Sequence, residues 1–190
     1  MSLRRATAAA VLLASATGVA AGRSIDVERS TLTVFVYKSG LFSAFADDHV
    51  IRAPIVSGTI SVDPPRSVAV KVRAGSLTVL DPKLSADKRA EVQARMLGPD
   101  VLDVEKYPEI VFEATSIEPA ASNRWTVVGR LTIHGETRST TVPVTEKNGS
   151  YTGSVVLKQR DFGIRPISIA GGTVKVKDEI RIEFDIVPGR

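Results

Sequence analysis

The 190-residue sequence contains no cysteine. Disulfide bridges, thiolate nucleophiles and cysteine-ligated zinc are therefore excluded, although the absence of cysteine identifies no cellular compartment. Catalytic and phosphate-binding motifs are missing as well, because no serine sits in a Gly-x-Ser-x-Gly nucleophile elbow and no phosphate-binding loop occurs. These absences remove several common sequence signatures of an enzyme.

The net charge of the chain is also small. The formal net charge is +4, and two of the positive charges, Arg4 and Arg5, lie in a segment that we expect to be removed, which leaves 4 − 2 = +2. No cluster rich in lysine and arginine occurs elsewhere, so nucleic acid is not an expected partner. The sequence is 43% hydrophobic and 24% charged, as in ordinary soluble proteins, and its length suits one domain.

Residues 1–21 have the layout of an export signal. A basic start is followed by an uncharged, alanine-rich stretch and then by small residues. The stretch falls short of the roughly 20 strongly apolar residues that a membrane-spanning helix needs. We therefore expect cleavage near Ala20 or Ala21, a periplasmic or secreted location, and a folded domain over residues 22–190.

The stretch from Arg124 to Arg138 shows the pattern that organises the chain. Its apolar side chains recur at every second position, with Gly129 interrupting the row, and the intervening residues are mostly polar. Because successive side chains of a strand point to opposite faces, this alternation predicts a half-buried strand. His134 and Gly135 follow, and a second strand-like run begins at Ser139, so we predict a hairpin.

Similar alternation recurs along the rest of the chain. From residue 56 onward, Val56, Gly58, Ile60 and Val62 are expected on one face of a strand. The last strand, within residues 173–187, alternates isoleucine and phenylalanine with charged residues without exception from 179 to 186. One helix is expected over residues 86–97, which contain no glycine or proline and end before Gly98 and Pro99.

The pattern predicts about eight short strands with one helical insertion and no alternation of strands and helices. Such a chain forms an antiparallel sandwich or a closed up-and-down barrel. In nearly every strand one face is apolar and the other is polar. Both architectures bury one face of each strand, so periodicity alone leaves the two open.

Three motifs in order resemble the YceI family, exported lipocalin-like proteins that are also called polyisoprenoid-binding proteins. They are the segments KYPEIVF at 106–112, GRLTIHGETR at 129–138 and RDFGI at 160–164. The resemblance implies an all-β fold, an eight-stranded antiparallel lipocalin-like barrel with one helical insertion. It also implies a binding protein without enzymatic activity or cofactor. Two segments depart from the family pattern, residues 42–49 and residues 83–97, and both are expected near an end of the barrel.

The implied ligand is an isoprenoid or a similar long-chain amphiphilic lipid, held in an apolar lumen. Transient contact with a membrane is compatible with such a ligand, and the oligomeric state is not predicted. Few aromatic residues and many valines and isoleucines at inward positions are compatible with an unfilled lumen. The expected lumen wall comprises Phe35, Phe42, Phe45, Ile60, Val70, Phe112, Trp125, Val127, Leu131, Ile133, Phe162, Ile182 and Phe184.

Other hypotheses remain open. Asp47, Asp48 and His49 could form a metal-dependent hydrolase site, but we favour a solvated loop there because His134, the other histidine, is distant in sequence. A filled barrel that serves only as an interaction module is a third hypothesis. We expect His134 at a strand end and a turn at Asn148-Gly149. Residues 160–164 could place a cation at the mouth of the lumen, but we favour a structural corner, in which Arg160 pairs with Asp161 and Gly163 allows a bend.

Overall fold

The fold is described from a computed structural model, which covers residues 22–39, 48–169 and 174–190. The predicted export signal, Phe42, Phe45 and Asp47 lie outside these residues. Within them, no helix has the length and apolar character that crossing a membrane requires.

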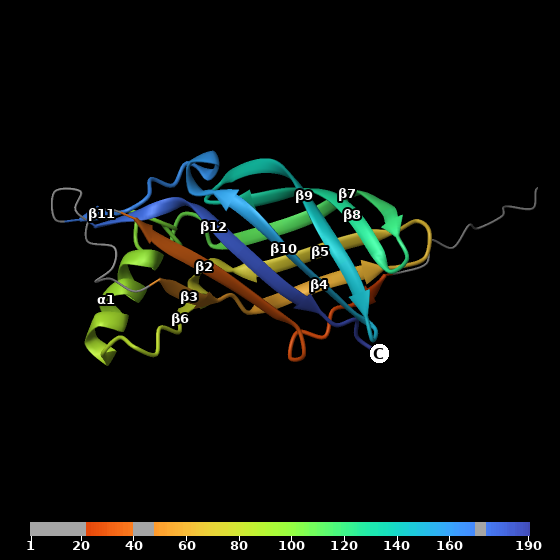
Figure 1. Ribbon diagram of the computed structural model, residues 1–190, viewed down its shortest axis with the longest axis horizontal. Helices are drawn as coiled ribbons and strands as arrows, with labels where there is room; N and C mark the ends of the chain where they lie inside the picture. The colour runs from red at the N-terminus through yellow and green to blue at the C-terminus, as the bar shows by residue number, and fades with distance from the viewer. Residues whose placement is uncertain (1–21, 40–47, 170–173) are drawn as a thin grey trace, which may run out of the picture.

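In the described part of the chain, twelve strands form one sheet in which every pair is antiparallel, and a single α-helix is inserted (Figure 1). The elements are β1 (Arg23–Ser24), β2 (Thr31–Ser39), β3 (His49–Arg52), β4 (Ile55–Ser61), β5 (Ser67–Arg73), β6 (Thr78–Val79), α1 (Ala86–Leu97), β7 (Glu109–Ala121), β8 (Arg124–Ile133), β9 (Glu136–Lys147), β10 (Ser150–Lys158), β11 (Ser168–Ile169) and β12 (Val174–Ile186). Two short 3₁₀ helices, η2 (Ala74–Ser76) and η3 (Gln159–Phe162), follow β5 and β10.

The sheet curls into a barrel of eight long strands. Consecutive long strands are neighbours from β4 to β12, and β12 pairs with β2. Strands β3 and β4 act as one bent strand, because β3 pairs with β2, β4 pairs with β5, and only Ala53 and Pro54 separate them. The remaining strands, β1, β6 and β11, have two residues each. The predicted eight-stranded antiparallel barrel is confirmed, and it takes the up-and-down form.

Backbone hydrogen bonds from both ends of the described chain complete one seam of the barrel. The Ile25 amide donates to the carbonyl of Gly58 in β4, and the Asp26 amide donates to the carbonyl of Val187. The amide of Gly189 donates to the Ser24 carbonyl. The first and last segments thus cover the edge of β4 that would otherwise expose unpaired backbone groups.

The hairpin predicted around His134 is present. Strands β8 and β9 pair along their length, and the turn residues His134 and Gly135 have φ angles of 51° and 77°. Asn148 and Gly149, with φ angles of 54° and 78°, make the equivalent turn between β9 and β10. Positive φ at both central residues is the geometry of a type I′ turn, which matches the twist of the flanking strands.

Helix α1 covers one end of the barrel, at the left of Figure 1. Its bounds, Ala86–Leu97, coincide with the prediction, and the Ser85 side chain caps it by accepting from the Lys88 amide. Gln93 fixes the helix to the barrel, because its amide donates to the Leu77 carbonyl and its carbonyl accepts from the Val79 amide. Met96 is the helix residue that is buried.

Two local predictions were wrong. Val56 was expected on the inner face, but it is 42% exposed while Ile55 is buried, because the pairing of β4 with β5 shifts by one residue between positions 55 and 57. The predicted corner at η3 is present, with Gly163 in the left-handed conformation. However, Arg160 contacts Asp178 rather than Asp161.

Two glycines of the inner face lie beneath phenylalanine rings. A Cβ atom at Gly129 would overlap the Phe112 ring, and one at Gly153 would overlap the Phe184 ring. Each ring therefore lies against the wall, over the space that the missing side chain leaves. This contact explains why Gly129 interrupts the apolar row of β8.

We predict that Gly129→Ala lowers the free energy of unfolding by about 1–3 kcal/mol, because the added methyl displaces Phe112 and crowds the backbone carbonyl of Glu113. Urea unfolding followed by circular dichroism measures the change. Gly75→Ala is the control, since its added methyl would meet no atom within 4 Å. Equal stabilities of the two variants would show that the packing of the Phe112 ring does not require glycine at position 129.

Candidate functional site: an apolar barrel lumen

The barrel encloses a cavity of about 260 Å³. One water molecule needs roughly 10–15 Å³ on the same scale, so the cavity has room for a chain of many atoms. Its lining comes from most of the long strands, from Met96 of α1, from residues 101–102 after the helix, and from η3. The cavity therefore runs through the barrel rather than lying at its surface.

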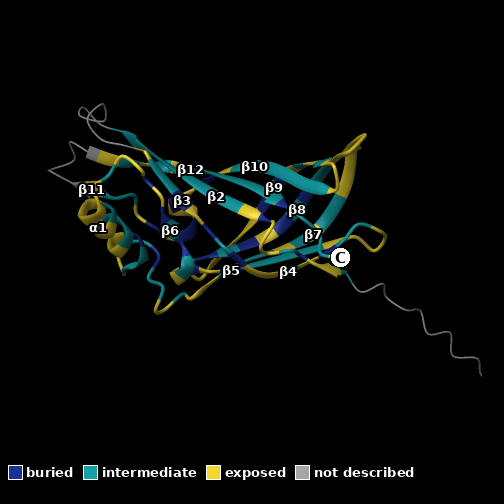
Figure 2. Cartoon of the chain, turned by 90° about the horizontal axis from the view of Figure 1, so that it is seen from below, coloured by how far each residue is buried: buried dark blue, intermediate teal, exposed yellow. Residues whose placement is uncertain are grey.

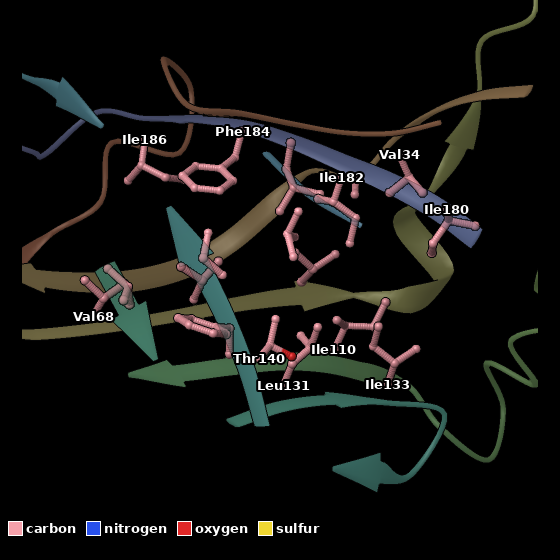
Figure 3. Close-up of a pocket in the computed structure, with 18 of the residues that line it drawn as sticks. Val34, Val68, Ile110, Leu131, Ile133, Thr140, Ile180, Ile182, Phe184 and Ile186 are labelled. Atoms are coloured by element: carbon pink, nitrogen blue, oxygen red, sulfur yellow. The ribbon is translucent and has the colours of Figure 1, made fainter. Parts of the chain in front are cut away.

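The wall is apolar but not tightly packed. In Figure 3, Val34, Ile180 and Ile182 project from one side of the cavity towards Leu131 and other side chains on the opposite side. Many wall residues are only partly buried, and none of the large side chains in the described residues is completely buried. Apolar side chains that face inward and still meet solvent indicate that the lumen is unfilled.

Most residues predicted for the lumen wall do line the cavity. Those that lie there are Ile60, Val70, Phe112, Trp125, Val127, Leu131, Ile133, Phe162, Ile182 and Phe184. Phe42 and Phe45 lie outside the described residues. Whether the residues in the wall contact a ligand stays a prediction.

The placement of Phe35 in the lumen wall was wrong. Its cross-strand partner is Arg181, on the charged outer row of β12, and the Arg181 guanidinium lies 4.7 Å from the centroid of the Phe35 ring. The neighbouring residues Val34 and Val36 line the cavity instead. Phe35 shares its face with threonines, so the alternation of β2 already favours an outward position, and the size of the ring was misleading.

Sequence reasoning missed several wall residues. Leu32, Val34 and Val36 could have been found from the period of β2, which places them opposite the apolar row of β12. Thr140 and Gln159 are buried polar residues that also line the cavity, and no apolar pattern marks them. The Gln159 amide is satisfied by a hydrogen bond to the Lys177 carbonyl.

The two ends of the lumen differ. Near α1 the lining includes the buried residues Leu77, Met96 and Leu102. Figure 2 shows buried segments around β6, beside the helix. At the other end the lining includes Arg66, which is exposed, and Trp125, which is partly buried. The cavity thus reaches the surface at the end opposite the helix, which we call the open end.

Polar groups gather at the open end. The Arg66 guanidinium lies 4.8 Å from the Trp125 ring centroid. Tyr151 lines the cavity there too. Burial, followed by the negative charge of Glu146, raises the pKa of Tyr151 above its ordinary value, so its phenol remains protonated at neutral pH. Side chains that can donate hydrogen bonds therefore lie at the open end of an otherwise apolar cavity.

Asp48 and His49, the two residues of the hydrolase hypothesis that the structure describes, contact other partners. His49 Nδ1 pairs with a carboxylate oxygen of Asp81, and the other oxygen of Asp81 accepts from the Val50 amide at 2.8 Å. Asp48 accepts from the amide of Lys38. The described residues hold no cluster of three or more His, Cys, Asp or Glu side chains arranged to bind a metal. Asp81 instead connects β3 to the segment before α1.

Lys38 lies near this cluster. Burial lowers its pKa below the ordinary value, while the charges of Asp48 and Asp81 act in the opposite direction. Its Nζ atom is buried and has no hydrogen-bond partner in the part of the chain that the structure describes. The helix end thus holds polar groups beside the strands, but none of these residues lines the cavity.

Comparison with known sequences matches residues 24–187 to the model of the YceI-like domain. A UPF0312 protein of Pseudomonas putida (strain W619) is 30% identical over 86 residues, which cover 40% of this chain and 45% of that protein. A UPF0312 protein of Vibrio cholerae is 25% identical over 137 residues, covering 66% of this chain and 68% of that protein. The matched part of the Pseudomonas relative is therefore less than half of its length.

Solved structures share the fold. The crystal structure of Burkholderia cenocepacia BcnA superimposes with a TM-score of 0.66 at 22% identity, covering 85% of this chain and 98% of that one. The YCEI protein of Campylobacter jejuni gives a TM-score of 0.54 at 16% identity, covering 70% and 80%. At these identities the likeness concerns the fold alone.

We predict that Asp81→Ala lowers the free energy of unfolding by about 2 kcal/mol, because it leaves the Val50 amide and the His49 ring without their partner. Urea unfolding measures the change. Glu105→Ala, at an exposed position, should change stability by no more than about 0.5 kcal/mol. An Asp81→Ala protein as stable as Glu105→Ala would contradict the structural role assigned to Asp81.

Proposed function

The chain belongs to the YceI-like domain family, and we propose that it is a non-enzymatic binding protein that holds an isoprenoid or similar long-chain amphiphile in its barrel lumen. The family match covers nearly all of the barrel. The Burkholderia and Campylobacter structures support the same architecture.

One observation carries the proposal: the cavity of about 260 Å³ has an almost wholly apolar wall. An apolar surface that remains in contact with water is unfavourable, and a hydrocarbon chain in the lumen would remove it. Such a chain gains roughly 0.8 kcal/mol for each CH₂ group buried. A long chain therefore binds well without any specific polar contact along its length.

The cross-section of the lumen favours a chain over a compact ligand. An eight-stranded barrel leaves an interior that side chains just fill or that accepts one small ligand. Here Phe112 and Phe184 lie against glycines of the wall, which leaves the centre of the lumen clear. The cavity also extends from α1 to the open end. An extended apolar molecule fits a cavity that runs along the barrel from one end to the other.

The hydrolase hypothesis has less support. Asp48 and His49 have different partners, and neither lines the cavity. Among the described residues, the polar side chains that line it, such as Thr140 and Gln159, include no histidine, lysine or carboxylate that could activate a nucleophile. We therefore favour binding without turnover.

Export is part of the proposal. Residues 1–21 carry a basic start, an uncharged alanine-rich stretch and small residues before Ala20 and Ala21. A periplasmic or secreted carrier would meet amphiphiles at or near a membrane, and transient contact with the membrane would let it load and unload them.

Native mass spectrometry of the purified mature protein, combined with organic extraction, tests the binding function. We expect one lipid molecule per chain, released by extraction and identified by its mass. A protein that carries no lipid, takes up none from mixed lipid extracts, and retains a divalent metal would overturn the carrier and favour the hydrolase.

A substitution inside the lumen tests where the ligand lies. Ile182→Trp adds bulk at a wall position next to Val34 of the adjacent strand, so we expect lipid uptake to fall at least about tenfold with the β-sheet circular dichroism signal retained. Val156→Trp is the matched control, because Val156 is 60% exposed on the outer face of β10. Equal uptake by both variants would place the ligand outside the barrel.

The intact mass of the protein recovered outside the cytoplasm of a bacterial host tests export. We expect a mass lacking the residues up to Ala20 or Ala21. Recovery of the full-length chain in the cytoplasm alone would contradict this part of the proposal and leave the lumen hypothesis untouched.

A further inference from the structure

Trp125 brings an unpaired donor to the open end of the lumen. Its ring lines the cavity, and its Nε1 atom is buried without a hydrogen-bond partner in the described part of the chain. A buried donor that lacks a partner is unfavourable, because it has given up its hydrogen bonds to water. A ligand atom that accepts a hydrogen bond there would recover this cost, whereas a hydrocarbon chain would not.

Arg66 brings a positive charge to the same place. It lies in the connection between β4 and β5, at the end of the barrel opposite α1 (Figure 1). Its Nε donates to the Val62 carbonyl, and its guanidinium is stacked over the Trp125 ring. These two contacts hold the side chain at the rim of the cavity, where it also forms part of the lining.

The guanidinium is available to a ligand. No carboxylate among residues 22–39, 48–169 and 174–190 forms an ion pair with Arg66. Other arginines on this barrel, such as Arg130 and Arg181, are paired with glutamates on the outer face. Arg66 differs from them in two ways. It lines the cavity, and its terminal nitrogens form no ion pair with a carboxylate of the described residues.

Two acidic residues lie close enough to influence Tyr151, namely Glu146 and Asp63. Glu146 accepts a hydrogen bond from the Gly149 amide and so belongs to the turn between β9 and β10. Burial is the main cause that raises the pKa of Tyr151; Glu146 and Asp63 raise it further and Arg23 lowers it, so the phenol stays available as a hydrogen-bond donor. The donors at the open end are therefore a cation, an indole and a phenol.

We propose that the open end is a head-group site, and that the lumen selects long-chain amphiphiles with an acidic head group, a carboxylate or a phosphate, over neutral ones. Arg66 supplies the charge, and Trp125 Nε1 supplies a hydrogen bond to the same head group. This inference rests on the proposed carrier function and adds the class of ligand. The apolar tail extends towards α1.

The test uses the purified mature protein and N-phenyl-1-naphthylamine, a neutral fluorescent probe of apolar cavities. Hexadecanoate, hexadecyl phosphate and hexadecanol, below their aggregation concentrations, compete with the probe. Because the three share one chain length, differences in affinity report the head group. Trp125 is the only tryptophan of the chain, so its fluorescence gives a second readout at the open end itself.

We expect the two acids to bind about fivefold to tenfold more tightly than the alcohol. Arg66→Gln should abolish this preference, so that the two acids and the alcohol compete with the probe about equally. Trp125→Phe keeps the aromatic ring and removes the donor, so it should reduce the preference by about threefold. Arg73→Gln is the matched control, because Arg73 is an exposed arginine at the other end of β5 and should retain the full preference.

Failure of the inference differs from failure of the carrier function. Equal binding of acids and alcohol by the unmodified protein, with the probe bound, overturns the acidic head-group site and keeps the lumen. Unchanged preference in Arg66→Gln also overturns it. Absence of probe binding overturns the carrier function, and the inference falls with it. Tighter binding of the phosphate or of the carboxylate supports the inference and identifies which acid the site prefers.

Discussion

The pairing of β12 with β2 is the interaction on which the rest of the structure depends. It joins the last long strand to the first and turns an open sheet into a barrel. The interior of this barrel is apolar and partly empty, which is the property that a lipid carrier needs.

Keeping that interior empty requires control over large side chains. Phe112 and Phe184 point inward, yet each ring lies over a glycine of a neighbouring strand and adds little bulk at the centre of the lumen. Aromatic rings over strand glycines also restore the packing that a glycine lacks. The same contact thus stabilises the wall and preserves the space, whereas the same rings at the centre of the lumen would fill it.

The sequence predicted features that depend on local pattern and missed those set by pairing between distant segments. The bounds of α1 were correct because propensity and end signals agree there. Phe35 was placed wrongly because the size of one residue was given more weight than the period of its strand. Val56 was misplaced by a bulge that alternation does not show. The contact of His49 with Asp81 joins residues far apart in sequence, so no motif could reveal it.

The difference between the two ends gives the lumen a direction. At the helix end, Gln93 fixes α1 to the backbone beside β6, and the buried residues Met96 and Leu102 close the cavity with hydrocarbon. At the open end, Arg66 and Trp125 offer charge and a hydrogen-bond donor. A molecule in the opposite orientation would bury its polar head among apolar side chains, which costs several kcal/mol. A carrier with these two ends would therefore take up an amphiphile tail first and present its head group at the surface.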